Sequence, residues 1–197
     1  MRIIGLCGGS GAGKGEVCRL FLKYGIPSVD TDAVSRIVMQ KGQKCYDEVI
    51  AAFGSEILDE NGEIIRKKLA SIIYGDTVKK CMLEKITHRH IIGHTMERFA
   101  EFEKQGYEYA IADAPLLFES GMNQICYKTM AVISDEENRV RRIIERDHIS
   151  REFALNRIRV QLNDEELKRK CDYIIYNNTT FEELDEIVKK TAAQIKI

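Results

Sequence analysis

The sequence predicts an α/β fold built around a mostly parallel sheet of five strands. Two observations carry this prediction: short apolar runs alternate with helical patterns, and the first run leads directly into a glycine-rich turn. A third observation is a long block, residues 33–105, in which no strand pattern occurs. A helical insertion between two strands of the sheet is therefore expected.

The five expected strands are short and almost continuously apolar, as is typical of strands that are buried on both faces. They are RIIGLC, IPSV, YEYAIAD, KTMAVIS and DYIIYNN, at residues 2–7, 26–29, 107–113, 128–134 and 172–178. The helix after the first strand is predicted from apolar residues at helical spacing, namely Val17, Leu20, Phe21 and Tyr24, with Gly25 as its stop. Within the insertion, residues 77–105 form a long helical pattern that only Gly93 interrupts.

The composition is that of an ordinary globular chain of 197 residues. Lys+Arg (30) and Asp+Glu (31) nearly cancel, so no global field favours nucleic acid, and no apolar run is long enough to span a bilayer. The six cysteines are scattered without a C-x-x-C pair, which favours reduced thiols over disulfides or zinc ligands. Because the N-terminus also lacks the apolar region of a signal peptide, we expect a cytoplasmic protein. We also expect it to be a monomer.

The stretch GLCGGSGAGKGEV has the pattern of a loop that binds phosphates. The motif G-x-x-x-x-G-K-[ST] is met at Gly8, Gly13 and Lys14, and it fails at Gly15, where a hydroxyl ligand of Mg²⁺ is normally placed. The loop follows a strand and precedes a helix, so that backbone N–H groups and the helix N-terminus converge on phosphate. The alternative is a glycine-rich turn without a ligand, but spacing and context both favour a phosphate loop.

Acidic residues follow two of the expected strands. In VDTDAVSR, Asp30 or Asp32 can cap the next helix, and Asp32 can also act as the base for a hydroxyl acceptor. In AIADAPLLFES, Asp113 stands where a carboxylate holds Mg²⁺ through water, or where it merely caps a loop. Both interpretations remain open for each position.

Arginines are concentrated in the segment 139–159, and Arg142 and Arg146 share one face of a predicted helix. This segment is either a solvated charged helix or a lid that closes over a transferring phosphoryl group. His90 and His94 have the i, i+4 spacing of metal ligands, but the H-E-x-x-H pattern is absent. No metal site is expected there.

Taken in order, these motifs resemble the dephospho-coenzyme A kinase family over nearly the whole chain. The matching elements are GLCGGSGAGKGEV, VDTDAVSR, FGSEILDENGEIIRKKLA, LEKITHRHI, DAPLLFESG, RRIIERD, RIRVQ and the final YNN. The resemblance implies a P-loop kinase core at residues 1–32 and 106–197, with a helical lid at about 142–166 and a helical acceptor domain at 33–105. It also implies transfer of a phosphoryl group from ATP, with Mg²⁺, to the ribose 3′-hydroxyl of dephospho-CoA, the last step of coenzyme A biosynthesis.

The resemblance further implies roles for individual residues. Asp32 would be the catalytic base, assisted by Lys14, Arg142 and Arg146 at the transferring group. The acceptor pocket would include Asp32, Arg36, His88, Leu116 and Leu117. ATP would be bound by Gly9, Gly11, Ala12, Gly13, Lys14, Gly15 and Glu16, with Asn177 near the adenine.

Two residues depart from the family pattern. Gly15 removes the hydroxyl next to Lys14, so Mg²⁺ is expected to be held through water by Asp32 or Asp113. Arg89 stands where the family usually has proline after the histidine, at the edge of the expected acceptor pocket. The alternatives to an active enzyme are a catalytically impaired paralogue that binds ATP or CoA, and a P-loop kinase for another small nucleotide-like acceptor.

Overall fold

The computed structural model describes residues 1–196, which fall into two compact units. The first comprises Met1–Val29 and Phe99–Ile197, and the second Asp30–Arg98. The functional boundaries expected from the sequence, with the acceptor domain at 33–105 and the lid at 142–166, remain a prediction.

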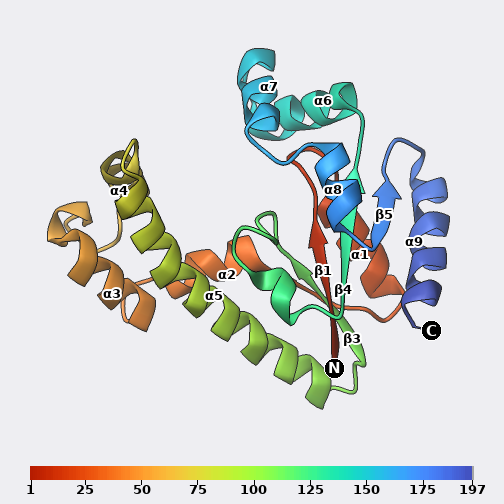
Figure 1. Ribbon diagram of the computed structural model, residues 1–197, viewed down its shortest axis with the longest axis horizontal. Helices are drawn as coiled ribbons and strands as arrows, with labels where there is room; N and C mark the ends of the chain where they lie inside the picture. The colour runs from red at the N-terminus through yellow and green to blue at the C-terminus, as the bar shows by residue number, and fades with distance from the viewer. Residues whose placement is uncertain (197) are drawn as a thin grey trace. The chain divides into compact units, whose positions relative to one another are not determined.

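A five-stranded sheet forms the centre of the first unit, and it confirms the predicted fold class (Figure 1). Its strands are β1 (Arg2–Cys7), β2 (Ser28–Asp30), β3 (Tyr109–Asp113), β4 (Lys128–Ile133) and β5 (Tyr173–Tyr176), in the spatial order β2-β3-β1-β4-β5. The pairs β1–β3, β1–β4 and β4–β5 are parallel. All five predicted strands are present, each within a few residues of its expected limits.

The strand order places the phosphate loop at a topological switch point. From β1 the chain crosses to β2 on one side, whereas from β4 it crosses to β5 on the other side. Open parallel sheets bind ligands in the crevice outside the carboxyl ends of two such strands. Cys7 ends β1 and pairs in register with Ala131 of β4, so the loops after β1 and β4 begin side by side.

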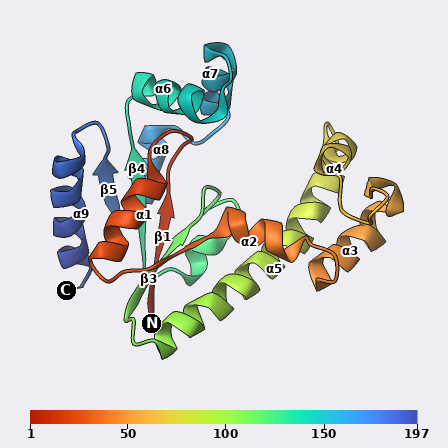
Figure 2. The ribbon, with the colours of Figure 1, turned by 180° about the vertical axis from the view of Figure 1, so that it is seen from behind.

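Helices α1 (Lys14–Lys23) and α9 (Phe181–Ile195) pack next to each other on one face of the sheet, and α8 (Asp164–Lys170) lies on the other face (Figures 1 and 2). The main core lies between the sheet and helices α1 and α9. Its fully buried members include Ile4, Leu6, Val17, Phe21, Ile111, Met130, Val132, Ile175 and Val188. The single-turn helix η2 (Met122–Ile125) connects β3 to β4.

Helices α6 (Glu136–Asp147) and α7 (Arg151–Arg159) form a hairpin with a small core of its own. This core is built from Val140, Ile143, Ala154 and Ile158. The chain reverses between the two helices at His148, which has a positive φ of 52°. Because the hairpin core is separate from the main core, the two helices can act as one rigid piece.

The second unit is helical, as predicted for the insertion. It contains α2 (Thr31–Val38), α3 (Lys44–Phe53), the single-turn helix η1 (Ser55–Ile57), α4 (Arg66–Ile73) and most of α5 (Thr77–Lys104). The only β pairing described within it is an isolated bridge between Leu58 and Ile64. Gly93 does not break α5, because a single glycine costs a long helix only about 1 kcal/mol relative to alanine.

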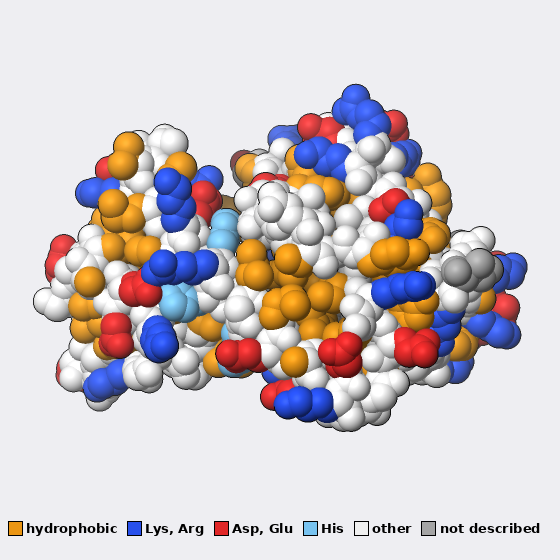
Figure 3. Space-filling model, turned by 60° about the horizontal axis from the view of Figure 1, so that its bottom comes forward, with side chains coloured by type: hydrophobic (Ala, Val, Ile, Leu, Met, Phe, Trp, Pro, Cys, Tyr) orange, Lys and Arg blue, Asp and Glu red, His pale blue; other side chains and the backbone are white. Residues whose placement is uncertain are grey.

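The distribution of charged side chains and the state of the cysteines agree with the composition of the chain. On the face shown in Figure 3, acidic and basic side chains are interspersed. Within residues 1–196, no helix is long and apolar enough to cross a membrane. All six cysteines are free thiols, and Cys7, Cys18 and Cys45 are buried.

Candidate functional site

The phosphate loop has the backbone shape that its glycines predict. Gly8, Gly11 and Gly13 have φ values of 144°, 76° and 93°, a region that side chains with a Cβ rarely adopt. The loop ends at the N-terminus of α1, and Lys14 folds back so that its Nζ donates to the Gly8 carbonyl at 3.2 Å. The ammonium group therefore lies across the concave side of the loop, where an anion would bind.

Neighbouring groups also require glycine at these positions. A Cβ on Gly8 would lie 2.5 Å from the Val132 carbonyl oxygen, and a Cβ on Gly13 would overlap the side-chain amide of Asn177. β4 and the segment after β5 thus approach the loop too closely for any side chain. The glycines allow both the turn and this close packing.

The carbonyls of the loop are held from outside by polar groups of distant segments. Arg142 of α6 donates to the Gly11 carbonyl at 3.1 Å, and to Ser134 Oγ and the Asn177 carbonyl at 3.2 and 3.1 Å. Asn177, which is only 5% exposed, donates its side-chain amide to the Ala12 carbonyl at 2.8 Å. These bonds fix the carbonyls of Gly11 and Ala12 on side chains of α6 and of the segment after β5.

Arg142 and Arg146, which the sequence predicts as equivalent lid arginines, have different surroundings. The guanidinium of Arg142 is built into the base of the loop, and burial lowers its pKa. Arg146 is exposed, and its Nε and Nη2 donate to the carboxylate of Asp147 at 2.7 and 2.9 Å. Hydrogen bonding from Arg146, and then from Arg157, lowers the pKa of Asp147 to about 2. Their catalytic roles remain predictions.

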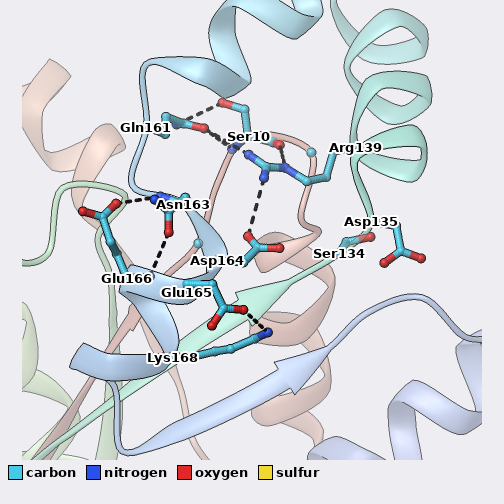
Figure 4. A network of polar contacts seen from close by, with 12 residues as sticks. Ser10, Ser134, Asp135, Arg139, Gln161, Asn163, Asp164, Glu165, Glu166 and Lys168 are labelled. Atoms are coloured by element: carbon cyan, nitrogen blue, oxygen red, sulfur yellow. Dashed lines mark hydrogen bonds and ion pairs between the residues drawn. The ribbon is translucent and has the colours of Figure 1, made fainter.

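Two polar residues at the loop were not selected from the sequence. Arg139 donates from Nε to the Ser10 carbonyl at 3.0 Å, and Gln161 accepts from the Ser10 N–H at 2.7 Å (Figure 4). Arg139 was one of several clustered arginines, and Gln161 closes the element RIRVQ. No sequence signal distinguishes them, because the close approach of the Arg139 guanidinium to Gly9 is apparent only from the structure.

Asp113 and Gly15 are the two positions that concern a metal ion in the first unit. Asp113 ends β3, and its Oδ2 accepts from the Cys18 thiol at 3.8 Å. Burial raises the pKa of Cys18 to about 12, so this thiol stays protonated as a donor at neutral pH. Gly15 has no atom within 4 Å of its Cβ position, and the next residue, Glu16, pairs its carboxylate with Arg19.

In the second unit, the structure decides between the two candidate capping residues. Asp30 caps α2, because its Oδ1 accepts from the N–H groups of Asp32 and Ala33 at 2.8 and 3.0 Å. The carboxylate of Asp32 is therefore not the cap, and the residue is exposed. Arg36 lies one turn further along α2 and donates from Nε to the Asp32 carbonyl at 3.3 Å.

The remaining acceptor residues are placed as follows. His88 is half-buried within α5. Arg89, at the position where the family usually has proline, continues the helix and forms an ion pair with Glu48 of α3. Leu116 is 56% exposed, whereas Leu117 is 0% exposed and packs against Gly5. The side chain of Leu117 belongs to the core, and the expected contacts of Leu116 and Leu117 with an acceptor remain a prediction.

Comparison with known proteins identifies the family. A family model described as dephospho-CoA kinase matches residues 2–183. The chain belongs to the dephospho-CoA kinase family. It is 40% identical over 188 residues to a dephospho-CoA kinase of Fusobacterium nucleatum, covering 95% of both chains. It is therefore an enzyme of coenzyme A biosynthesis, a kinase for which ATP is the phosphoryl donor.

Solved structures support the same fold. A protein of Thermus thermophilus superposes with a TM-score of 0.84 at 29% identity, with 98% of this chain and 97% of that one covered. A shikimate kinase of Bacteroides thetaiotaomicron superposes with a TM-score of 0.54 at 14% identity, over 100% and 99% of the two chains. This second likeness concerns the fold alone, which is that of the P-loop kinases.

Proposed function

We propose that the chain transfers the γ-phosphoryl group of ATP to the ribose 3′-hydroxyl of dephospho-CoA at the loop Gly8–Gly15. The observation that carries this assignment is the arrangement of loop carbonyls, which are bound from outside by Arg142 and Asn177. Backbone N–H groups of the loop held in this way would bind the β- and γ-phosphates, and Lys14 would contribute its charge. Gly9, Gly11, Ala12, Gly13, Gly15 and Glu16 would contribute through the backbone.

Arg142 and Arg146 would have different roles in the reaction. Arg142 would keep the loop in its binding shape, since its guanidinium is already committed to the loop carbonyls. Arg146 would stabilise the transferring phosphoryl group, because its exposed guanidinium can leave Asp147 for a more highly charged partner. Asn177 lies between the loop and the end of β5, a place that suits recognition of the adenine.

Asp32 would accept the proton of the 3′-hydroxyl as that oxygen attacks the γ-phosphorus and the bond to the β-phosphate oxygen breaks. This role for Asp32 is supported by the capping of α2, which is done by Asp30 and leaves the Asp32 carboxylate exposed at the helix start. Arg36, on the same helix, and His88 on α5 would bind the acceptor. Leu116 would offer its exposed side chain to the same substrate.

The residues present also fit Mg²⁺ held through water. Within residues 1–196 no cluster of three or more His, Cys, Asp or Glu side chains could hold a metal by itself. Mg²⁺ in kinases keeps several waters and uses one or two carboxylates together with substrate phosphates. Asp113 or Asp32 would supply that carboxylate, and the bound ion would offset the negative charge of the phosphates.

Replacing Asp32 tests the proposed base. Asp32→Asn keeps the shape of the side chain but removes its proton affinity, so kcat should fall by roughly 10²-fold or more with ATP binding unchanged. The measurement is ADP release with and without dephospho-CoA, together with calorimetric titration of ATP. The matched control is Asp30→Asn, which should stay active because asparagine caps a helix about as well as aspartate.

Wild-type turnover in Asp32→Asn would contradict its role as base. Absence of ADP release by the wild-type chain with dephospho-CoA would contradict the proposed function itself. The acceptor is tested in the same assay with other hydroxyl substrates. We further propose that the enzyme acts as a cytoplasmic monomer, which light scattering on the purified protein can test.

A further inference from the structure

All three polar groups of Ser10 are bonded to two side chains from distant elements (Figure 4). The N–H donates to Gln161 Oε1 at 2.7 Å, and Gln161 Nε2 donates to the Ser10 hydroxyl at 3.3 Å. The Ser10 carbonyl accepts from Arg139 Nε at 3.0 Å. The first turn of the phosphate loop is therefore fixed by α6 and by the connection between α7 and α8.

Arg139 is buried, with only 6% of its surface exposed. Burial lowers the pKa of its guanidinium, and the nearest carboxylate oxygen, on Asp164, is 3.7 Å away. A buried cation is unfavourable unless it is paired and hydrogen-bonded. The bonds to Ser10 and Gln161 supply that compensation, so Arg139 and Gln161 hold one another in place at the loop.

The contact of Arg139 and Gln161 with the loop requires a glycine at position 9. Its φ is not positive, so the backbone conformation alone does not require glycine. A Cβ at Gly9 would nevertheless overlap Arg139 Nη2 and lie 3.2 Å from Gln161 Oε1. Glycine is needed here because Arg139 and Gln161 approach the loop backbone closely.

Gln161 also lies beside the reaction centre proposed above. It lines a small cavity of about 60 Å³ together with Gly8, Gly9 and the exposed Leu116. One side of this cavity is thus the phosphate loop, and another is the segment proposed to bind the acceptor. A residue that fixes this boundary affects how the two substrates align.

We propose that Gln161 is a positioning residue for phosphoryl transfer, which holds the α7–α8 connection on the phosphate loop through Ser10. This inference rests on the proposed function. When the two bonds are present, the loop and the α6–α7 hairpin form one preorganised surface around the γ-phosphate. When they are absent, the loop can still bind ATP, but the alignment on which the rate depends is lost.

The experiment uses Gln161→Met, which keeps the length of the side chain and removes both hydrogen bonds to Ser10 as well as the longer one from Arg139. We expect kcat to fall by roughly 10-fold or more, with the KM for ATP changed by less than about 3-fold. The matched control is Asn156→Leu, which removes an exposed amide from α7 without touching the loop. The control should keep wild-type kcat, and wild-type kcat in Gln161→Met would overturn the proposal.

A double-variant cycle tests whether Ser10 is the point of contact. Because the Gln161 amide and the Ser10 hydroxyl share one bond, Ser10→Ala in the Gln161→Met background should lower kcat no further than Gln161→Met does. Independent effects that multiply would overturn the assignment of Ser10 as the partner. Thermal unfolding of each variant shows whether a loss of activity is caused by loss of the folded structure.

Limited trypsin digestion measures the same contact without turnover. Arg151, Arg157 and Arg159 are exposed cleavage sites on α7. In Gln161→Met, cleavage at these sites should be faster than in the wild type and in Asn156→Leu, because the α7–α8 connection is released. Equal cleavage rates would overturn the inference, whereas an inactive wild type with accelerated cleavage in Gln161→Met would overturn only the proposed function.

Discussion

The two ends of the phosphate loop contain the same residue type for opposite reasons. At Gly9, Gly11 and Gly13 an added Cβ would meet Arg139 or Asn177, whereas at Gly15 it would meet nothing within 4 Å. The first part of the loop is locked by side chains from α6 and from the end of β5. Its last position opens to solvent at the start of α1.

This difference means that the conformation of the loop does not depend on the residue at position 15, where the hydroxyl is missing. The glycines at positions 9, 11 and 13 are parts of a packed structure, so changing them alters the loop itself. Gly15 has no such neighbours, so changing it alters only what the loop offers to a ligand. We therefore expect the loop to bind phosphate without a serine or threonine at position 15.

The largest expected effect comes from Gly11→Ala. The φ of 76° is strained for alanine, and the new Cβ would lie 2.5 Å from the Arg139 carbonyl oxygen, which is backbone and cannot turn away. We expect the free energy of unfolding to fall by about 3 kcal/mol and ATP binding to be lost. Chemical denaturation measures the free energy of unfolding, and calorimetric titration measures ATP binding. Near-wild-type values of both would contradict the conclusion that the loop is tightly packed at Gly11 and open at Gly15.

Gly9→Ala should have an intermediate effect, because its obstacle is the end of a side chain. We expect a loss of about 1–3 kcal/mol in the free energy of unfolding as Arg139 is pushed off Ser10. In an Arg139→Met background the same alanine should be better tolerated, since the guanidinium is gone. Equal destabilisation in both backgrounds would mean that Gly9 is required for another reason.

Gly15→Ser should have the smallest effect on stability and an effect of opposite sign. Serine fits the open space and is a better helix residue than glycine, so the protein should gain about 0.5 kcal/mol or less. Its hydroxyl would also lower the Mg²⁺ concentration for half-maximal activity and raise kcat. Gly15→Ala is the matched control, which shares the gain in stability but not the change in Mg²⁺ dependence.

Rate against Mg²⁺ concentration, and calorimetric titration of ATP with and without Mg²⁺, distinguish these variants. Superimposable Mg²⁺ curves for wild type and Gly15→Ser would show that water and a carboxylate already replace the hydroxyl. Destabilisation by either substitution would contradict the open surroundings of Gly15. Activity that appears only in the serine variant would favour a catalytically impaired chain.

The sheet and the loop could be predicted because their signals are local. Continuous apolar runs mark buried parallel strands, and the spacing of Gly8, Gly13 and Lys14 marks the loop between strand and helix. The helix over 77–104 followed from its length and periodicity, which outweigh the effect of Gly93. None of these features depends on a distant part of the chain.

The surroundings of the loop could not be predicted, because they depend on contacts between distant segments. Sequence spacing places Arg142 and Arg146 on one helix face, but it does not show that Arg142 reaches the loop carbonyls while Arg146 pairs with Asp147. Likewise, a leucine pair after β3 gives no sign that Leu117 faces the core while Leu116 is exposed. The choice of Asp30 as cap required the backbone geometry at the start of α2.

The bonds of Arg139, Arg142, Gln161 and Asn177 also affect the order in which the protein can fold. The phosphate loop is synthesised before the side chains that hold it, because these lie more than 120 residues later, in the last third of the given sequence. Contacts between such distant residues form late, after most of the chain has been made. A nascent chain that ends before α6 therefore carries the whole glycine motif but none of these four side chains, and the loop acquires all of them only after β5 has been made.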